Sequence, residues 1–431
     1  MKPLRRKEVW LRASLFLAAT LLATVESHAQ NVVTEWNSIA SATIIAQGGK
    51  PPASSGVWFA YTGIAVYDAV NAIHRQFQPF YYNGSSPDDA SEEAAAVAAA
   101  HRVLVKYFPA QQAALDAQFI VSQAKINATP DAKAAGIATG EAAAAALIAA
   151  RAGDGLEANV PYAPGSGPGV WQPTPPKFLP GVTPWLGQMR PFTMTSASQF
   201  RPEGPTPLTS DEWEDDYNQV RTLGEINSTV RTPEQTEIGL FWTEHTGQQY
   251  ARAFGYIAEN YKLNVMDTAR LMAILWTGFA DSLIACFDAK YHYNFWRPVT
   301  AVRDGGGNPE LIADSNWTPL GVTPNHPEYP AAHACATSTV SRLVGDYFGT
   351  RKVRIVVNSL AFGDGVHTHT FDDTTDWFED VFWARIYAGF HYQHSLEDGG
   401  AIGRQVSKQL FRKNFRPQKL RRRDASNSEG H

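Results

Sequence analysis

The feature that most constrains the fold is a succession of helical segments with recognisable ends. Apolar residues recur at the helical period through most of the 431-residue chain. Thr129-Pro130 and Thr232-Pro233-Glu234-Gln235 are N-terminal capping patterns, and Gly349 ends the segment from Ala331 to Phe348. Only residues 352–357 resemble a strand. These patterns predict an all-α protein.

The helical segments divide the chain into two packed bundles. Predicted helices cover residues 36–46, 57–77, 90–107, 110–126, 130–152, a segment opening at 211, and 233–261, 267–296, 331–348, 375–388 and 395–413. We expect bundles over residues 30–152 and 210–415, and a flexible basic tail over 416–431. Residues 153–209 are rich in Gly and Pro, and we expect a lid-like loop that its aromatic residues pack down: Tyr162, Trp171, Phe178, Trp185 and Phe192.

The N-terminus has the pattern of a secretion signal. Basic residues precede an apolar run from Ala13 to Val25, and Ser27-His28-Ala29 offers a cleavage site. We therefore predict a signal peptide over residues 1–29 and an exported protein, periplasmic or extracellular. Removing this segment, with its five basic and two acidic residues, changes the formal net charge from −5 to −8.

Composition excludes several classes of function. With 44% hydrophobic and 18% charged residues, the chain is too apolar to be disordered. Its negative charge disfavours a nucleic-acid partner, and its two cysteines exclude a disulfide scaffold or a Cys-rich metal site. No internal run approaches the ~20 apolar residues of a spanning helix, so we expect no membrane span after signal removal. The sequence does not indicate an oligomeric state.

The first unusual segment contains Lys290 and Arg297 among aromatic residues. A spacing of seven residues places both on one face if one helix covers them. Two cations in apolar surroundings favour a multivalent anion between them. The alternative is that both extend to solvent at a helix end and pair with Asp281 or Asp288.

The second segment runs from His326 to His333. Pro330 predicts a helix start, which places Ala331, Ala332 and His333 in a first turn with free N–H groups. Such a terminus accepts an anion, and its dipole disfavours a protonated His333. Each histidine taken singly is equally consistent with packing or capping.

The third segment contains Arg385 and His391. One ideal helix would place them ~120° apart, so they meet through the reach of the arginine or through a break near Gly389. Three cations and two histidines spread over three segments outline a site for a tetrahedral oxyanion.

The order of these motifs carries a resemblance to a known family. Lys-x6-Arg-Pro, Pro-x-x-His and Arg-x5-His, within residues 267–400, resemble the signature of the vanadium-dependent haloperoxidases and the type 2 phosphatidic acid phosphatase superfamily. The resemblance implies two four-helix bundles and a vanadate cofactor, in a site that phosphate also fits. Substrates would be hydrogen peroxide and halide, or a phosphate ester.

The resemblance also implies residue roles. The oxyanion would be neutralised by the backbone N–H of Ala332 and by Lys290, Arg297 and Arg385. His391 would be the covalent partner, as ligand to vanadium or as the nucleophile that forms a phosphohistidine. His333 would be the acid–base residue, and Lys290 would polarise peroxide.

Several positions depart from the family pattern. Ala331 and Ala332 replace the usual Ser-Gly, and Ala384 replaces a Ser. Ser395 replaces the Asp that would orient the imidazole of His391, a role left to a backbone carbonyl or to Glu397 or Asp398. The lost Ser hydroxyl alone removes a hydrogen bond worth ~1.5–3 kcal/mol to a charged oxyanion.

His326 favours oxidation as the reaction. The algal bromoperoxidases resemble this chain in having a His at the corresponding position, and this resemblance favours bromide or iodide as the substrate. The alternative is that His326 is a surface histidine. The leading hypothesis is a vanadate-dependent haloperoxidase. The alternatives are an acid phosphatase-type phosphomonoesterase and a catalytically silent scaffold with a degraded site.

Four other features of the sequence indicate chemistry less strongly. His367 and His369, near Asp372 and Asp373, are expected in a solvated loop rather than a metal site. Glu244-His245 is expected to face solvent or cap a neighbour, and Asp281 and Asp288 to be counter-ions of Lys290. Cys286 and Cys335 either pack as buried thiols or form a disulfide between two helices.

Overall fold

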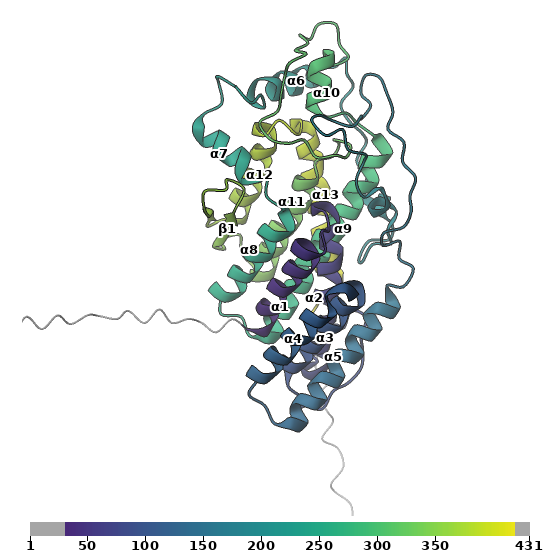
Figure 1. Ribbon diagram of the computed structural model, residues 1–431, viewed down its shortest axis with the longest axis vertical. Coiled ribbons are helices and arrows are strands. Elements are labelled where there is room, and N and C mark those ends of the chain that lie inside the picture. The colour runs from purple at the N-terminus through teal and green to yellow at the C-terminus, as the bar shows by residue number, and fades with distance from the viewer. Residues whose placement is uncertain (1–30, 419–431) are drawn as a thin grey trace, which may run out of the picture.

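The chain folds as a long helical body (Figure 1). The computed structural model describes residues 31–418, in which thirteen α-helices accompany one two-stranded sheet. The predicted all-α class is confirmed. The predicted signal peptide, residues 1–29, lies outside the described residues and stays a prediction. Of the predicted flexible tail, 416–431, residues 416–418 are hydrogen-bonded to residues 76–78, so the expectation is wrong for these three; the rest lies outside the described residues.

The N-terminal helices pack through small residues. They are α1 (Val32–Ser41), α2 (Pro52–His74), α3 (Glu92–Tyr107), α4 (Gln112–Lys125) and α5 (Pro130–Ala150). A Cβ atom on Gly136 or Gly140 of α5 would lie 2.3 Å from a backbone oxygen of the α3 region. These glycines therefore let α3 and α5 pack almost backbone to backbone.

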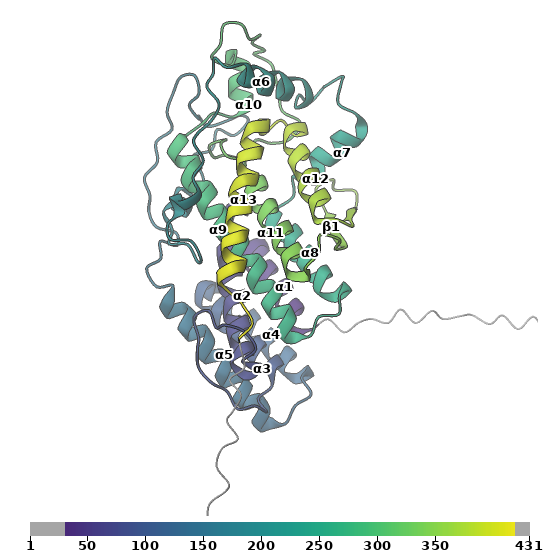
Figure 2. The ribbon, with the colours of Figure 1, turned by 180° about the vertical axis from the view of Figure 1, so that it is seen from behind.

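The C-terminal helices lie together, above the N-terminal helices in the view from behind (Figure 2). They are α6 (Asp211–Leu223), α7 (Pro233–Phe241), α8 (Thr246–Asn260), α9 (Val265–Tyr293), α10 (Pro298–Asp304), α11 (Ala332–Phe348), α12 (Thr374–Tyr387) and α13 (Gln393–Lys413). The long apolar α9 packs against α2, α11 and α13. One continuous hydrophobic core therefore joins the two halves of the molecule.

Two predicted helices are shorter than the sequence indicated. The segment 233–261 breaks between α7 and α8, where the carbonyl of Trp242 turns away to accept a hydrogen bond from Arg385. The segment 267–296 ends at Tyr293 because Asn294 adopts a left-handed conformation, φ 54°. Arg297 instead precedes α10, which the sequence did not predict. The prediction that Lys290 and Arg297 share one helix face is therefore wrong.

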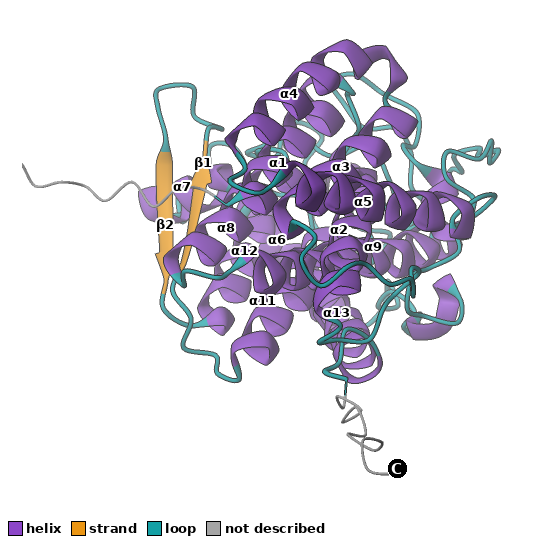
Figure 3. Ribbon diagram, turned by 90° about the horizontal axis from the view of Figure 1, so that it is seen from below, coloured by secondary structure: helices purple, strands orange, loops and turns teal. Residues whose placement is uncertain are grey.

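The predicted strand pairs with a second one. Strand β1 (Ile355–Ser359) is antiparallel to β2 (His367–Phe371), as the view from below shows (Figure 3). The expectation that His367 and His369 lie in a loop is wrong, since both are in β2.

The segment between the halves, residues 153–209, is fixed along α9. Asp281 of α9 accepts hydrogen bonds from the backbone N–H groups of Phe192 and Thr193, at 2.7 and 2.8 Å. Arg201 pairs with Asp288, 2.7 Å apart. Trp171 and Trp185 are buried and Tyr162 and Phe192 half-buried, but Phe178 is 63% exposed, so it does not help to pack the segment down.

Two helices of the described residues satisfy the length and apolarity of a membrane span. They are α5 and α9. In α9, 94% of the most apolar 18-residue stretch is buried inside the protein, as in a core helix. In α5 the buried share of the corresponding stretch is 39%.

Candidate active site

A cavity of about 920 Å³ opens onto the second and third motif segments. The residues that line it include His326, Ala332, His333, Arg385 and His391. They come from the loop before α11, the first turn of α11, the last turn of α12 and the loop after α12. The structure thus brings residues 65 positions apart to one floor, which we call the oxyanion floor.

Lys290 lies behind this floor. Its side chain is fully buried in the last turn of α9, and its Nζ donates to the carbonyls of Pro327 and Glu328, at 3.0 and 2.7 Å. Asp281 and Asp288 bind the 153–209 segment instead, so the expectation that either is its counter-ion is wrong.

Arg297 connects the floor residues from behind. Its fully buried guanidinium donates from Nε to the carbonyl of His326 at 3.0 Å and from Nη1 to the carbonyl of Phe390 at 3.0 Å. Nη1 also lies 3.2 Å from Nε2 of His391, and Nη2 lies 3.0 Å from Nδ1 of His326. Arg297 therefore fixes both histidines, although neither it nor Lys290 is among the described residues that line the cavity.

Arg385 faces the cavity with an unused donor. Its Nη1 donates to the carbonyl of Trp242 at 2.8 Å, and its guanidinium carbon lies 4.7 Å from the ring centre of Phe390. Its Nε is buried without a hydrogen-bond partner. Gly389, at φ 76°, ends α12 and turns the chain so that His391 follows at the same floor. A buried cation with a free N–H is a ready anion donor.

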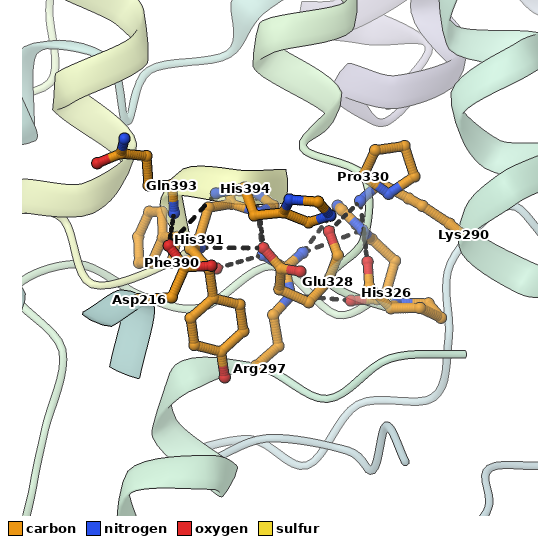
Figure 4. A network of polar contacts seen from close by, with 12 residues as sticks. Asp216, Lys290, Arg297, His326, Glu328, Pro330, Phe390, His391, Gln393 and His394 are labelled. Carbon is orange, nitrogen blue, oxygen red and sulfur yellow. Dashed lines mark hydrogen bonds and ion pairs between the residues drawn. The ribbon is translucent and has the colours of Figure 1, made fainter. Parts of the chain in front are cut away.

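Glu328 is the functional residue that sequence reasoning missed (Figure 4). Its Oε1 lies 2.7 Å from Nδ1 of His391, and both side chains are buried. Glu397 instead accepts from Gln393, and Asp398 accepts from Tyr329. The expectation that one of those two acids orients the imidazole is therefore wrong. The sequence did contain a signal for this role, because Glu328 is an acidic residue within the His326–His333 segment, and that part of the segment forms a buried loop.

This carboxylate fixes the tautomer of His391. An ionised carboxylate can only accept a hydrogen bond, so Nδ1 carries the hydrogen and the lone pair lies on Nε2. In the place of the family's Asp stands Ser395, whose carbonyl accepts from the N–H of Ala331 at 3.0 Å. The carboxylate that orients the imidazole of His391 thus comes from the segment before α11.

The floor holds more positive than negative charge. Burial lowers the pKa of Lys290 to about 8, of Arg297 to about 10 and of Arg385 to about 9. Burial raises the pKa of Glu328 to about 7. Three buried cations, Arg385 at the floor and two behind it, are thus accompanied by a single carboxylate. An isolated charge in such surroundings is costly unless a counter-ion joins it.

The histidines of the floor are neutral. Burial, together with the neighbouring arginines and lysine, lowers the pKa of His326, His333 and His391 well below the ordinary value. His333 is the second residue of α11, and its Nε2 lies 2.9 Å from Oγ1 of Thr246. Ala331 provides no side-chain cap, so the first-turn N–H groups of α11 are free for a ligand.

The weaker candidates lie outside the floor. His369 lies 2.9 Å from both Asp380 and Glu237, and the described residues contain no group of three potential metal ligands. Cys286 and Cys335 are free buried thiols, so the disulfide is absent. Glu244 pairs with Arg252, 2.7 Å away.

His245 and Thr246, at the start of α8, contact two different parts of the chain. The ring Nε2 of His245 lies 3.0 Å from the carbonyl of Lys50, in the loop before α2. The ring is therefore held by this loop and does not face solvent. The residue that does touch His333 is its neighbour, Thr246.

Comparison with known proteins agrees with this geometry. A family profile described as the VCPO second helical-bundle domain matches residues 270–419. Vanadium chloroperoxidase of Curvularia inaequalis is 30% identical over 151 residues, 29% of this chain and 25% of that protein. The match thus spans about a quarter of that relative.

Solved structures share the fold over most of the chain. A bacterial vanadium-dependent iodoperoxidase superposes with a TM-score of 0.75 at 21% identity, covering 90% of this chain and 97% of that chain. A holo-type bacterial vanadium-dependent chloroperoxidase gives 0.67 at 18% identity, covering 85% and 92%.

Residues 270–419 therefore match the family of the VCPO second helical-bundle domain. Over most of its length the chain shares the helical fold of the solved bacterial vanadium-dependent haloperoxidases.

Proposed function

We propose that this protein is a vanadate-dependent haloperoxidase that oxidises bromide or iodide with hydrogen peroxide. The observation that carries the proposal is the uncompensated positive charge of the oxyanion floor beside a neutral His391. Three buried cations stand against one carboxylate, and a tetrahedral oxyanion supplies the missing negative charge.

The residues present fit vanadate. Nε2 of His391 carries the lone pair for the covalent bond, because Glu328 holds the Nδ1 proton. The buried Nε of Arg385 has a free N–H, and so do the first-turn amides at Ala332 and His333. Bound vanadate would supply Lewis-acid activation of peroxide without a change in its own oxidation state.

The surrounding residues would position and move protons. His333, neutral and held through Nε2 by Thr246, accepts a proton from hydrogen peroxide as it binds. Lys290 and Arg297 stabilise negative charge at the floor from behind and fix the backbone of residues 326–328. Burial of all three cations strengthens each of these interactions.

His326 supports the preference for bromide or iodide. Its ring lies at the cavity floor, 3.0 Å from Nη2 of Arg297, and its centre lies 5.1 Å from the ring centre of Phe287. A soft, polarisable halide would meet a neutral imidazole there, with the guanidinium of Arg297 behind the ring.

The test is to load purified protein with orthovanadate and compare two reactions. Halide oxidation with hydrogen peroxide is measured as triiodide or tribromide absorbance, and ester hydrolysis is measured with 4-nitrophenyl phosphate. The proposal is supported if the rate of halide oxidation depends on vanadate and is higher than the rate at which the vanadate-free protein hydrolyses 4-nitrophenyl phosphate. Phosphate hydrolysis that vanadate inhibits would assign the site to a phosphomonoesterase acting through a phosphohistidine. Absence of both reactions would make the chain a silent scaffold.

A further inference from the structure

A second and much smaller cavity adjoins Glu328, and we call it the Glu328 cavity. Its volume is about 10 Å³, measured as the space open to the centre of a water molecule. On this measure a cavity needs about 10–15 Å³ to hold one water molecule. Among the described residues, none lines both this cavity and the large one above the oxyanion floor. The Glu328 cavity is therefore a separate space, with room for one water molecule and for nothing larger.

Five segments of the chain close the Glu328 cavity. They contribute Pro205 and Thr206, Trp213 and Asp216, Phe295, Glu328 and Tyr329, and Tyr392, His394 and Ser395. Asp216 accepts hydrogen bonds from the N–H groups of Gln393 and His394, at 3.1 and 3.3 Å (Figure 4). Oε1 of Glu328 accepts another from the N–H of Tyr392, at 3.3 Å. Two acids thus fix the backbone of residues 392–394, and the fold itself forms the cavity.

Four buried polar atoms of the residues that line the cavity have no hydrogen-bond partner in the described part of the chain. They are Oε2 of Glu328, Oη of Tyr392, Oγ of Ser395 and Oγ1 of Thr206. All four residues are between 0% and 6% exposed. Leaving such an atom unsatisfied is costly, and it is most costly for a carboxylate oxygen. Four such atoms around one cavity indicate a polar ligand.

The surroundings favour water over a cation or a direct contact between side chains. Nζ of Lys290 already donates to the backbone carbonyl of Glu328 at 2.7 Å, so a second cation here would add to an excess of positive charge. Oγ of Ser395 does not satisfy the geometry of a hydrogen bond to Oε2. A water molecule can donate to a carboxylate while it accepts from a hydroxyl, and a buried water makes about three hydrogen bonds.

We propose that one water molecule binds in the Glu328 cavity, donates a hydrogen bond to Oε2 of Glu328 and so holds Oε1 on Nδ1 of His391. The terminal torsion of a glutamate side chain is broad, so the contact at Oε1 alone fixes the carboxylate plane poorly. A second contact at Oε2 fixes it. The inference goes beyond the proposed function, because this support of His391 serves any oxyanion at the floor.

Thr206 is the positioning residue that this inference adds. It lies near the end of the 153–209 segment and lines the Glu328 cavity but not the large cavity. An effect of Thr206 on the floor must therefore pass through the Glu328 cavity. The 153–209 segment would thus support the site from the side opposite to the ligand.

The variant that displaces the water is Thr206→Ile. Isoleucine has a methylene group in place of the threonine hydroxyl and carries a further methyl group, about the size of a water molecule, into the cavity. The matched control is Thr183→Ile. Thr183 lies in the same segment, is 8% exposed where Thr206 is 6%, and also has a buried hydroxyl without a partner, but it lines neither cavity. Thr206→Ser keeps the hydroxyl and should behave as the wild type.

Three measurements follow the water and its effect. X-ray diffraction from the vanadate-free wild type should show one density peak within about 3 Å of Oε2 of Glu328, and Thr206→Ile should lack it. In proton NMR without vanadate, a carboxylate partner shifts the Nδ1–H resonance of His391 downfield; this resonance should move upfield in Thr206→Ile and stay in place in Thr183→Ile. Calorimetry should show that Thr206→Ile weakens vanadate binding by about fivefold or more and that Thr183→Ile does not.

Three results would overturn the inference: no density peak in the wild type, a peak whose contacts identify a metal ion, or loss of the peak in Thr206→Ile with an unchanged Nδ1–H resonance. If Thr206→Ile does not fold, Tyr392→Phe replaces it, because it removes a partner of the water without adding volume. Its control is Tyr217→Phe, in a tyrosine that donates to the carbonyl of Ile312 at 2.9 Å, away from the cavity. Only Tyr392→Phe should move the resonance, and equal shifts in both variants would also overturn the inference. A wild type that shows the peak but binds no vanadate would instead contradict the proposed function.

Discussion

Two buried clusters of charge in this molecule differ in how their cations are satisfied. Where residues 150–193 meet α2, Arg151 lies 2.6 Å from Asp154, which also accepts from Tyr61 at 2.5 Å. The remaining nitrogens of Arg151 donate to the carbonyls of Arg190 and Pro191. At the oxyanion floor, by contrast, the buried Nε of Arg385 has no partner.

The difference separates structure from function. A balanced cluster stabilises the junction between chain segments and leaves no donor for a ligand. An unbalanced cluster costs stability until an anion binds. Residues with shifted pKa values in a balanced cluster are structural, whereas residues with shifted pKa values in an unbalanced cluster indicate a binding site.

The largest effect is expected at the covalent ligand. His391→Ala should abolish vanadate binding, because it removes the Nε2 lone pair that Glu328, through Nδ1, directs to the floor. Calorimetric titration measures the binding, and far-UV circular dichroism should show unchanged helix content. Retained affinity would remove His391 from the site.

Acid–base chemistry should fail separately from anion binding. His333→Ala should keep vanadate, since the three cations remain, and should lower turnover by ~10²–10⁴-fold. Steady-state halide oxidation at saturating vanadate measures this effect. Turnover within a few-fold of the wild type would make His333 a packing residue.

Substitutions in the balanced cluster around Arg151 should change the free energy of unfolding and leave vanadate binding unchanged. Asp154→Asn leaves Arg151 buried without a counter-ion and should reduce the free energy of unfolding by about 3–5 kcal/mol. Arg201→Gln, which breaks a partly exposed pair with Asp288, should cost about 1 kcal/mol or less. Denaturant titration measures both variants. Equal losses would mean that burial does not distinguish the two pairs.

Glu328→Gln should weaken vanadate binding by about 10- to 100-fold, because it removes the charged partner of Nδ1 of His391. The control is Asp398→Asn, in the acid that the sequence offered for the same role; it bonds to Tyr329 and His394 and should leave affinity unchanged. The reverse ranking in a vanadate titration would return the role to Asp398.

The smallest effect is expected at a third charged cluster, where α7, α12 and β2 meet. Burial acts to lower the pKa of His369, but Asp380 and Glu237 outweigh it and raise that pKa above its ordinary value. Its stabilisation is therefore full below about pH 6.5 and is lost as the pH rises through the raised value. His369→Gln should cost about 1 kcal/mol of unfolding free energy at low pH and less at high pH. A cost that grows with pH would contradict the pairing.

The sequence predicted what local chemistry determines. Capping patterns located α5, α7 and α11, and motif spacing identified the three cations and the histidines at the floor. It could not show that Asn294 would end α9 before Arg297, or that the carbonyl of Trp242 would serve Arg385 143 residues away. Glu328 meets His391 across 63 residues, a contact that only the assembled helices create.

The central claim is that the floor has excess positive charge until an oxyanion binds, and the stability of Arg385→Met tests it most directly. Without anion, this variant should be at least as stable as the wild type, because it removes a buried cation that has no counter-ion. With vanadate at about 100 times the wild-type Kd, the wild type should gain about 2.7 kcal/mol of unfolding free energy and the variant much less. A variant less stable than the wild type without anion, and stabilised equally by vanadate, would contradict the account.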